Sequence, residues 1–122
     1  KNMNIYFSGD SGYGPHFAEI KEKFGPFDFA MMECGQYNEK WESIHMPPEQ
    51  TAQAAIDVGA KVMMPIHWGA FSLAPHPWTD PITRLLQAAE AQNIPVVHPI
   101  IGERFTIGED FPRVKWWEME SD

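Results

Sequence analysis

The chain has 122 residues, 43% hydrophobic and 21% charged, which is enough for one domain with an apolar core and excludes a disordered chain. No apolar run approaches the roughly 18 residues that span a bilayer, so we expect a soluble chain; its compartment is unknown, cytoplasmic if one must be chosen. Nine Lys and Arg residues against seventeen Asp and Glu residues give a formal net charge of -8, which disfavours nucleic acid as a partner.

The first part of the chain predicts a strand, a loop and a helix. Residues 4–8 form a short β-rich run, and the Gly-Asp-Ser-Gly cluster at 9–12 has strong turn chemistry. Apolar residues then recur at helical spacing until Gly25-Pro26, namely Phe17, Ile20 and Phe24.

Residues 27–34 predict a central strand, because nearly every position except Asp28 and Glu33 is apolar. The following residues, 35–46, have no periodicity. A long aperiodic loop inside a compact domain is often functional, so these residues are a candidate site loop.

The remaining elements continue the alternation of helix and strand. Helices are predicted from Pro47-Pro48 and from Asp80-Pro81 to Asn93, and strands at 61–66, at 94–101 and, as a strand or hairpin, at 102–107. This order predicts an α/β architecture with a mostly parallel sheet. Three short helices can cover only one face of such a sheet, so something else is expected to cover the other face.

Three polar residues stand near the carboxyl ends of the predicted strands, where ligands bind in open α/β sheets. Asp10 follows the first strand, His45 lies in the loop after the second, and His67 ends the third. Carboxylate and imidazole groups are ligands for divalent ions, and the single cysteine, Cys34, excludes a multi-cysteine zinc site.

Structural explanations compete with these assignments. Asp10 can be a turn residue that bonds its own backbone, His67 a satisfied residue at a strand end, and His45 a solvated residue near a helix start. A structural role is favoured more strongly for His16, His76 and His98, and for Cys34 as a buried thiol. Four aromatic residues either line an apolar substrate mouth or simply pack: Trp41, Trp68, Phe71 and Trp78.

Four motifs follow one another along the chain: Gly9-Asp10-Ser11-Gly12-Tyr13, Phe24-Gly25-Pro26-Phe27-Asp28, His45-Met46-Pro47-Pro48-Glu49-Gln50 and Ile66-His67-Trp68-Gly69-Ala70-Phe71. In order and spacing they resemble the C-terminal half of a metallo-β-lactamase-fold hydrolase. Within that superfamily the chain is most similar to the branch that contains N-acyl phosphatidylethanolamine-hydrolysing phospholipase D and its bacterial relatives. The resemblance extends to about Arg104.

The resemblance implies that residues 1–122 are the C-terminal half of a four-layer αββα domain, with one sheet and helices on one of its faces. The N-terminal half, which carries the family's His-x-His-x-Asp-His signature, is absent from this sequence. The resemblance also implies two divalent metal ions, usually zinc, with Asp10 bridging them and His67 ligating the second. His45 would then act as a catalytic residue at the leaving group or phosphate of the substrate.

The resemblance therefore predicts that the whole protein is a zinc-dependent hydrolase that cleaves a small-molecule or lipid phosphodiester. The alternatives are a lactonase or other ester hydrolase with the same site, and a non-catalytic interaction module in which Asp10 and His67 are only structural. Residues 1–122 alone are expected to be inactive, to bind zinc weakly or not at all, and to self-associate through the uncovered sheet face.

Overall fold

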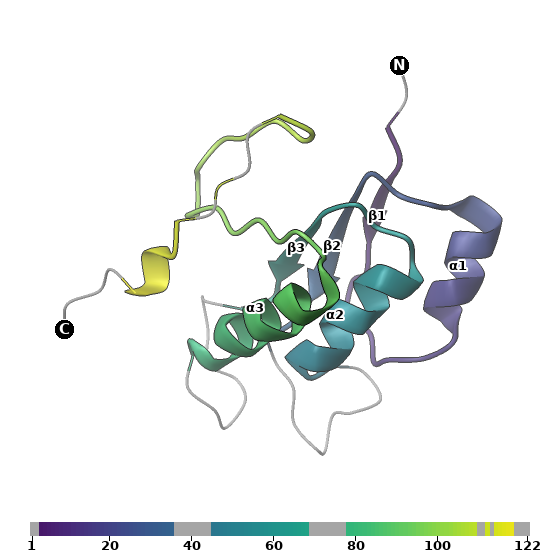
Figure 1. Cartoon of the computed structure of the whole chain (residues 1–122), viewed down its shortest axis with the longest axis horizontal. Coiled ribbons are helices and arrows are strands. Elements are labelled where there is room, and N and C mark those ends of the chain that lie inside the picture. The colour runs from purple at the N-terminus through teal and green to yellow at the C-terminus, as the bar shows by residue number, and fades with distance from the viewer. Residues whose placement is uncertain (1–2, 36–44, 69–77, 110–111, 113, 119–122) are drawn as a thin grey trace.

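The computed structural model describes residues 3–35, 45–68, 78–109, 112 and 114–118. Its elements are, in chain order, β1 (Ile5–Phe7), α1 (His16–Phe24), β2 (Phe29–Glu33), α2 (Pro48–Asp57), β3 (Met63–Ile66), α3 (Asp80–Gln92) and the short 3-10 helix η2 (Trp116–Glu118). The strands form a parallel sheet in the order β1-β2-β3 (Figure 1). The predicted α/β class, the parallel sheet and the central position of β2 are confirmed.

The connections explain why the strands are parallel. Helix α1 joins β1 to β2, and helix α2 joins β2 to β3, so each strand returns in the direction of the one before it. In register, Phe7 pairs with Met31, and Glu33 pairs with Ile66. The carboxyl ends of all three strands therefore meet at one edge of the sheet.

Proline, glycine and asparagine set the ends of the helices. The extended backbone of Pro47 leads into α2, which has Pro48 in its first turn, where a missing N–H costs nothing. Gly25 ends α1, and Asn93 ends α3 in the left-handed conformation with φ 61°. The longest helix, α3, has 13 residues, and no helix in the described parts of the chain is long and apolar enough to cross a membrane.

The core lies between the sheet and the three helices, which share one side of it (Figure 1). Its side chains come from two strands and all three helices, and include Phe17, Ala30, Met32, Ala52, Ala55, Met63, Ile82 and Leu85. The alanines of α2 allow its backbone to approach the sheet closely. Each fully buried large apolar side chain contributes roughly 1.5–3 kcal/mol, so this layer supplies most of the stability.

The opposite face of the sheet is only partly covered. Phe29 of β2 is buried and packs against Phe105, with ring centroids 6.0 Å apart. On β1, however, Ile5 and Phe7 are 46% and 61% exposed. Helices on one face of the sheet are thus confirmed, while the second half of the domain and the four-layer arrangement stay predictions.

Two sequence-based predictions near the C-terminus are wrong, since residues 94–101 and 102–107 form no strand. Val96 makes only an isolated parallel bridge with Met63. Pro95 and Pro99 lack the N–H that a ladder needs, so the pairing cannot extend beyond this bridge. Phe24 was predicted on the apolar stripe of α1, but it is 68% exposed because the helix ends there and the described residues leave its side chain uncovered.

Candidate metal centre

Asp10, His45 and His67 lie together at the carboxyl edge of the sheet. One ligand atom from each can be chosen so that all three lie within 4.8 Å of one another. His67 Nε2 is 3.8 Å from Asp10 Oδ1, and the imidazole rings of His45 and His67 stack with centroids 5.2 Å apart. The predicted meeting of these residues is therefore found in the structure, while their roles as ligands and catalyst stay predictions.

The spacing of these donors fits one divalent ion after small side-chain movements. Two ligand atoms bound to the same zinc at about 2.0–2.2 Å can be at most about 4.4 Å apart. The 3.8 Å pair of Asp10 and His67 meets this limit, and the 4.8 Å spread of the full set exceeds it by a few tenths of an ångström. The side chains of Asp10 and His67 are 65% and 34% exposed, so both can adjust.

Glu33, the last residue of β2, is a part of the site that the sequence did not reveal. Its side chain is fully buried, and its Oε1 lies 2.9 Å from His45 Nδ1 and accepts a hydrogen bond from the Met46 N–H at 3.2 Å. Burial raises the pKa of Glu33 to about 7, although the bond from Met46 lowers it. Its position at the carboxyl end of a predicted buried strand was the available signal, but nothing in the sequence linked it to His45.

The backbone at the end of β2 also holds the neighbouring loops in place. The Glu33 N–H donates to Ser8 Oγ in the loop that carries Asp10, and its carbonyl accepts from Thr51 Oγ1 in α2, both at 2.9 Å. The next residue, Cys34, donates its N–H to the carbonyl of Ile66. This strand end therefore connects all three segments that supply the candidate ligands.

Gly35 is required by the turn that presents His67. His67 has a positive φ of 71°, and a Cβ at Gly35 would lie 1.8 Å from the His67 carbonyl oxygen. Contacts that short do not occur between real atoms, so only glycine allows the two backbones to pass. The positive φ of His67 is a strained conformation of the kind that concentrates at functional sites.

Two further residues have the structural roles that were predicted for them. Cys34 is fully buried, desolvation raises the pKa of its thiol, and its Sγ donates to the Pro81 carbonyl, so it is no nucleophile. His16 Nε2 lies 3.0 Å from Ser11 Oγ; because that hydroxyl donates to the Gly12 carbonyl, His16 donates to it and supports the Asp10 loop.

A structural role was also predicted for His98 and His76, and the structure describes only the first of them. His98 is buried and packs edge-on against Trp117, with ring centroids 4.9 Å apart, which fits a structural role. His76 lies outside the described residues.

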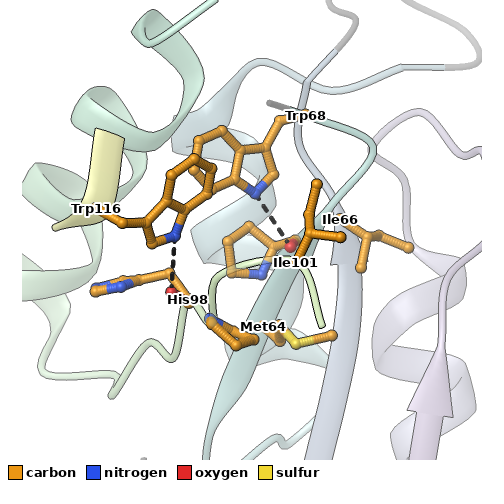
Figure 2. Close-up of a pocket in the computed structure, with 8 residues that line it drawn as sticks. Met64, Ile66, Trp68, His98, Ile101 and Trp116 are labelled. Carbon is orange, nitrogen blue, oxygen red and sulfur yellow. Dashed lines mark hydrogen bonds between the residues drawn. The ribbon is translucent and has the colours of Figure 1, made fainter. Parts of the chain in front are cut away.

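An apolar pocket of about 140 Å³ is lined in part by Ile66 and Trp68, the residues on either side of His67 in the sequence (Figure 2). The indoles of Trp68 and Trp116 stack above it at 5.4 Å, and their N–H groups donate to the carbonyls of Pro65 and His98. This volume is similar to that of a cavity that holds a benzene-sized group, about 150 Å³.

Of the other aromatic residues considered as lining a substrate mouth, the structure describes one. Trp78 stacks on Trp116 with centroids 6.4 Å apart and is 42% exposed, so it extends the row of indoles toward solvent. Trp41 and Phe71 lie outside the described residues.

Comparison with known proteins supports the resemblance. Residues 1–68 match the family model described as "Beta-lactamase superfamily domain". An uncharacterized protein of Mycobacterium tuberculosis is 41% identical over 121 residues, which are 97% of this chain and 32% of that protein. An N-acyl-phosphatidylethanolamine-hydrolyzing phospholipase D of Caenorhabditis elegans is 36% identical over 76 residues, 60% of this chain and 21% of that protein. The chain thus spans a third or less of these two relatives.

A solved structure agrees with the fold. Igni18, a metallo hydrolase from the archaeon Ignicoccus hospitalis, superposes with a TM-score of 0.58. The match covers 79% of this chain and 37% of the Igni18 chain. The sequence identity is 21%, so this likeness concerns the fold alone.

Proposed function

This chain belongs to the β-lactamase superfamily, and we propose that the whole protein is a metal-dependent hydrolase whose site includes Asp10, His45 and His67. The observation that carries the proposal is the convergence of these three donors within 4.8 Å at the carboxyl edge of the sheet. They come from three separate segments, so no local sequence preference brings them together.

Asp10 and His67 would hold the ion. A bound divalent ion supplies activated water, because it lowers the pKa of that water toward roughly 7. His45, only 8% exposed, is held by Glu33 and would either complete the ligand set or donate a proton to the leaving oxygen of the substrate. The water oxygen would bond to the electrophilic centre while the bond to the leaving oxygen breaks and that oxygen takes up the proton.

We propose zinc as the metal, two ions in the whole protein, and a lipid or small-molecule phosphodiester as the substrate. The C. elegans relative, whose name gives this chemistry, supports the phosphodiester. The apolar pocket lined by Ile66 and Trp68, the sequence neighbours of His67, supports it too, since it offers space for an apolar part of a substrate. Lactones and other esters remain the competing substrates, because activated water attacks several electrophiles.

Replacing Asp10 with Asn tests the proposal. In the whole protein, Asp10→Asn should abolish hydrolysis of a panel of phosphodiesters and lower the metal content measured after purification. Asp28→Asn is the control: it makes the same change just before β2, at the amino edge of the sheet, and should leave hydrolysis and metal content unchanged. Turnover retained in Asp10→Asn would overturn the assignment, and turnover of lactones alone would replace the phosphodiester.

For residues 1–122 taken alone, we propose self-association through the open face of the sheet. Ile5 and Phe7 are exposed there, and Ile101 is 82% exposed. Exposed apolar patches of this kind favour association. Sedimentation should show a concentration-dependent dimer or larger species that is weakened by Phe7→Ser, whereas a monomer at all concentrations would contradict the proposal.

A further inference from the structure

The parallel ladder between β1 and β2 ends abruptly beside the candidate metal centre. The Ser8 N–H donates to the Met31 carbonyl at 3.0 Å, which is the last main-chain bond between the two segments at this edge in the described part of the chain. Main-chain groups that face the same neighbouring strand recur at every second residue. Glu33 is therefore the next residue whose N–H and carbonyl face the β1 side.

Two side-chain hydroxyls occupy the places that a longer β1 would fill. If β1 continued, the Ser8 carbonyl would accept from the Glu33 N–H, and the Asp10 N–H would donate to the Glu33 carbonyl. Instead, the Glu33 N–H donates to Ser8 Oγ, and the Glu33 carbonyl accepts from Thr51 Oγ1, both at 2.9 Å. The hydroxyls thus replace the strand partner, and the main chain of residues 9–12 leaves the sheet.

The Ser8 hydroxyl also acts on the residue that precedes Asp10. Because Ser8 Oγ accepts from the Glu33 N–H, its own proton is available, and it donates to the Gly9 carbonyl at 2.8 Å. Gly9 has a positive φ of 60°, a left-handed conformation that an extended strand does not have. One hydroxyl therefore holds both the end of the ladder and the turn that leads to Asp10.

Asp10 depends on this main chain for its position. Its carboxylate accepts no hydrogen bond from any residue that the structure describes, and its Oδ1 lies 3.8 Å from His67 Nε2. Its side chain is 65% exposed, so packing does not hold it in place. The path of residues 8–10 is therefore what brings the Asp10 carboxylate into the cluster with His45 and His67.

We propose that Ser8 is a positioning residue of this site: its hydroxyl ends the pairing of β1 with β2 and sets the turn at Gly9, so that the Asp10 carboxylate reaches the metal. The inference rests on the proposed metal site and adds to it a residue that contacts none of the candidate ligand side chains. The competing role is stabilisation alone, because serine hydroxyls often bond to nearby main chain. In that case the hydroxyl affects folding but not metal binding.

Four variants of the whole protein separate positioning from stabilisation. Ser8→Thr keeps the hydroxyl, and Ser8→Val has the same shape without it, so the difference between these two variants reports the hydroxyl alone. Ser8→Ala removes the hydroxyl without adding a branch, in case a branched side chain prevents folding. Thr83→Val is the control, since it removes a hydroxyl that donates to a main-chain carbonyl on α3, away from the site. The measurements are Co²⁺ affinity from visible absorption and the melting temperature of the metal-free protein.

The affinity should follow the hydroxyl. Groups that orient metal ligands change metal affinity by roughly 10- to 100-fold, and we expect roughly 10-fold weaker Co²⁺ binding in Ser8→Val and Ser8→Ala, because Ser8 acts through the main chain. Ser8→Thr and Thr83→Val should bind Co²⁺ as the wild-type protein does. The loss should persist far below the melting temperature, since it reflects where Asp10 lies in the folded protein.

Several outcomes would overturn the inference. Equal affinities in Ser8→Thr and Ser8→Val would do so, and so would a lower melting temperature with unchanged affinity in Ser8→Ala, which is the result expected of a purely structural hydroxyl. Absence of Co²⁺ binding by the wild-type protein would overturn it together with the proposed metal site.

Neither measurement uses hydrolysis, so the inference and the proposed function can fail separately. A protein whose Co²⁺ affinity follows the Ser8 hydroxyl but that hydrolyses no ester keeps this inference and loses the proposed function. A protein that hydrolyses phosphodiesters and has equal Co²⁺ affinities in Ser8→Thr and Ser8→Val keeps the proposed function and loses this inference.

Discussion

The helix-covered face of the sheet and its carboxyl edge belong to the same strands but are held together differently. The covered face is held by the burial and close packing of apolar side chains, such as Met32 and Leu85. The edge consists of hydrogen bonds to a buried carboxylate, a backbone contact at Gly35 and a strained residue, His67. The covered face therefore supplies most of the burial that stabilises the fold, and the edge arranges the candidate ligands through a few close contacts.

A methyl group at Gly35 tests how tightly the edge is built. Gly35→Ala should cost more than about 4 kcal/mol of the free energy of unfolding or prevent folding, because the new Cβ overlaps the His67 carbonyl. Urea denaturation measures this. Gly102→Ala is the control: nothing lies within 4 Å of its Cβ, so only its positive φ is penalised, by about 1–2 kcal/mol. Equal effects of the two changes would contradict the close approach at Gly35.

A cavity in the covered face should lower stability and leave the site intact. Leu85→Ala should lower the free energy of unfolding by about 2–5 kcal/mol, because Leu85 is fully buried. Co²⁺ affinity of the folded fraction should be unchanged, since Leu85 belongs to the apolar core and is not one of the three candidate ligands. Leu86→Ala, at a half-buried neighbour on the same helix, should cost less. A loss of affinity in Leu85→Ala would show that face and edge are coupled.

The ion pair between α2 and α3 should have the smallest effect of the three. Arg84 donates two hydrogen bonds to Glu49 and holds the pKa of that carboxyl below its usual 4.5. Because the folded pKa is lowered, this stabilisation is present above pH 4.5 and is lost as the pH falls through the folded value. Glu49→Gln should therefore cost about 0.2–1 kcal/mol at neutral pH, as for exposed pairs, and nothing at low pH.

Glu90→Gln on α3 provides the matched control for that prediction. It removes an exposed carboxylate that is not part of the Glu49–Arg84 pair. Its effect on the free energy of unfolding should stay within about 0.5 kcal/mol. A Glu49→Gln effect that persists under acid conditions would mean that packing, not charge, is responsible.

The sequence predicted the sheet, its three helices and the position of Asp10 and His67, because each depends on local signals. Apolar periodicity, prolines at helix starts and Asn93 at the end of α3 are readable along the chain. Parallel connections then bring the carboxyl ends of the strands to one edge. The strand predicted at 94–101 does not form. Its valines and isoleucines are typical of a strand, but Pro95 and Pro99 lack the N–H groups that pairing with β3 requires.

The contact of Glu33 with His45 could not be predicted in the same way. It spans twelve positions, of which residues 36–44 lie outside the described part of the chain, and no spacing rule links a strand end to a residue before a helix. The close approach of Gly35 to His67 joins two different strand ends, so it too depends on the three-dimensional arrangement. Both features belong to the edge, where tertiary contacts rather than periodicity decide the structure.

Titration of the metal-free whole protein with Zn²⁺, against a chelator of known affinity, tests most directly whether the edge is a metal site. We expect two ions per protein, with fewer ions bound in His67→Ala and in Asp10→Asn and both retained in Leu86→Ala. Absence of binding by the wild-type protein, or binding unchanged by the loss of both Asp10 and His67, would contradict the assignment of the edge as a metal centre.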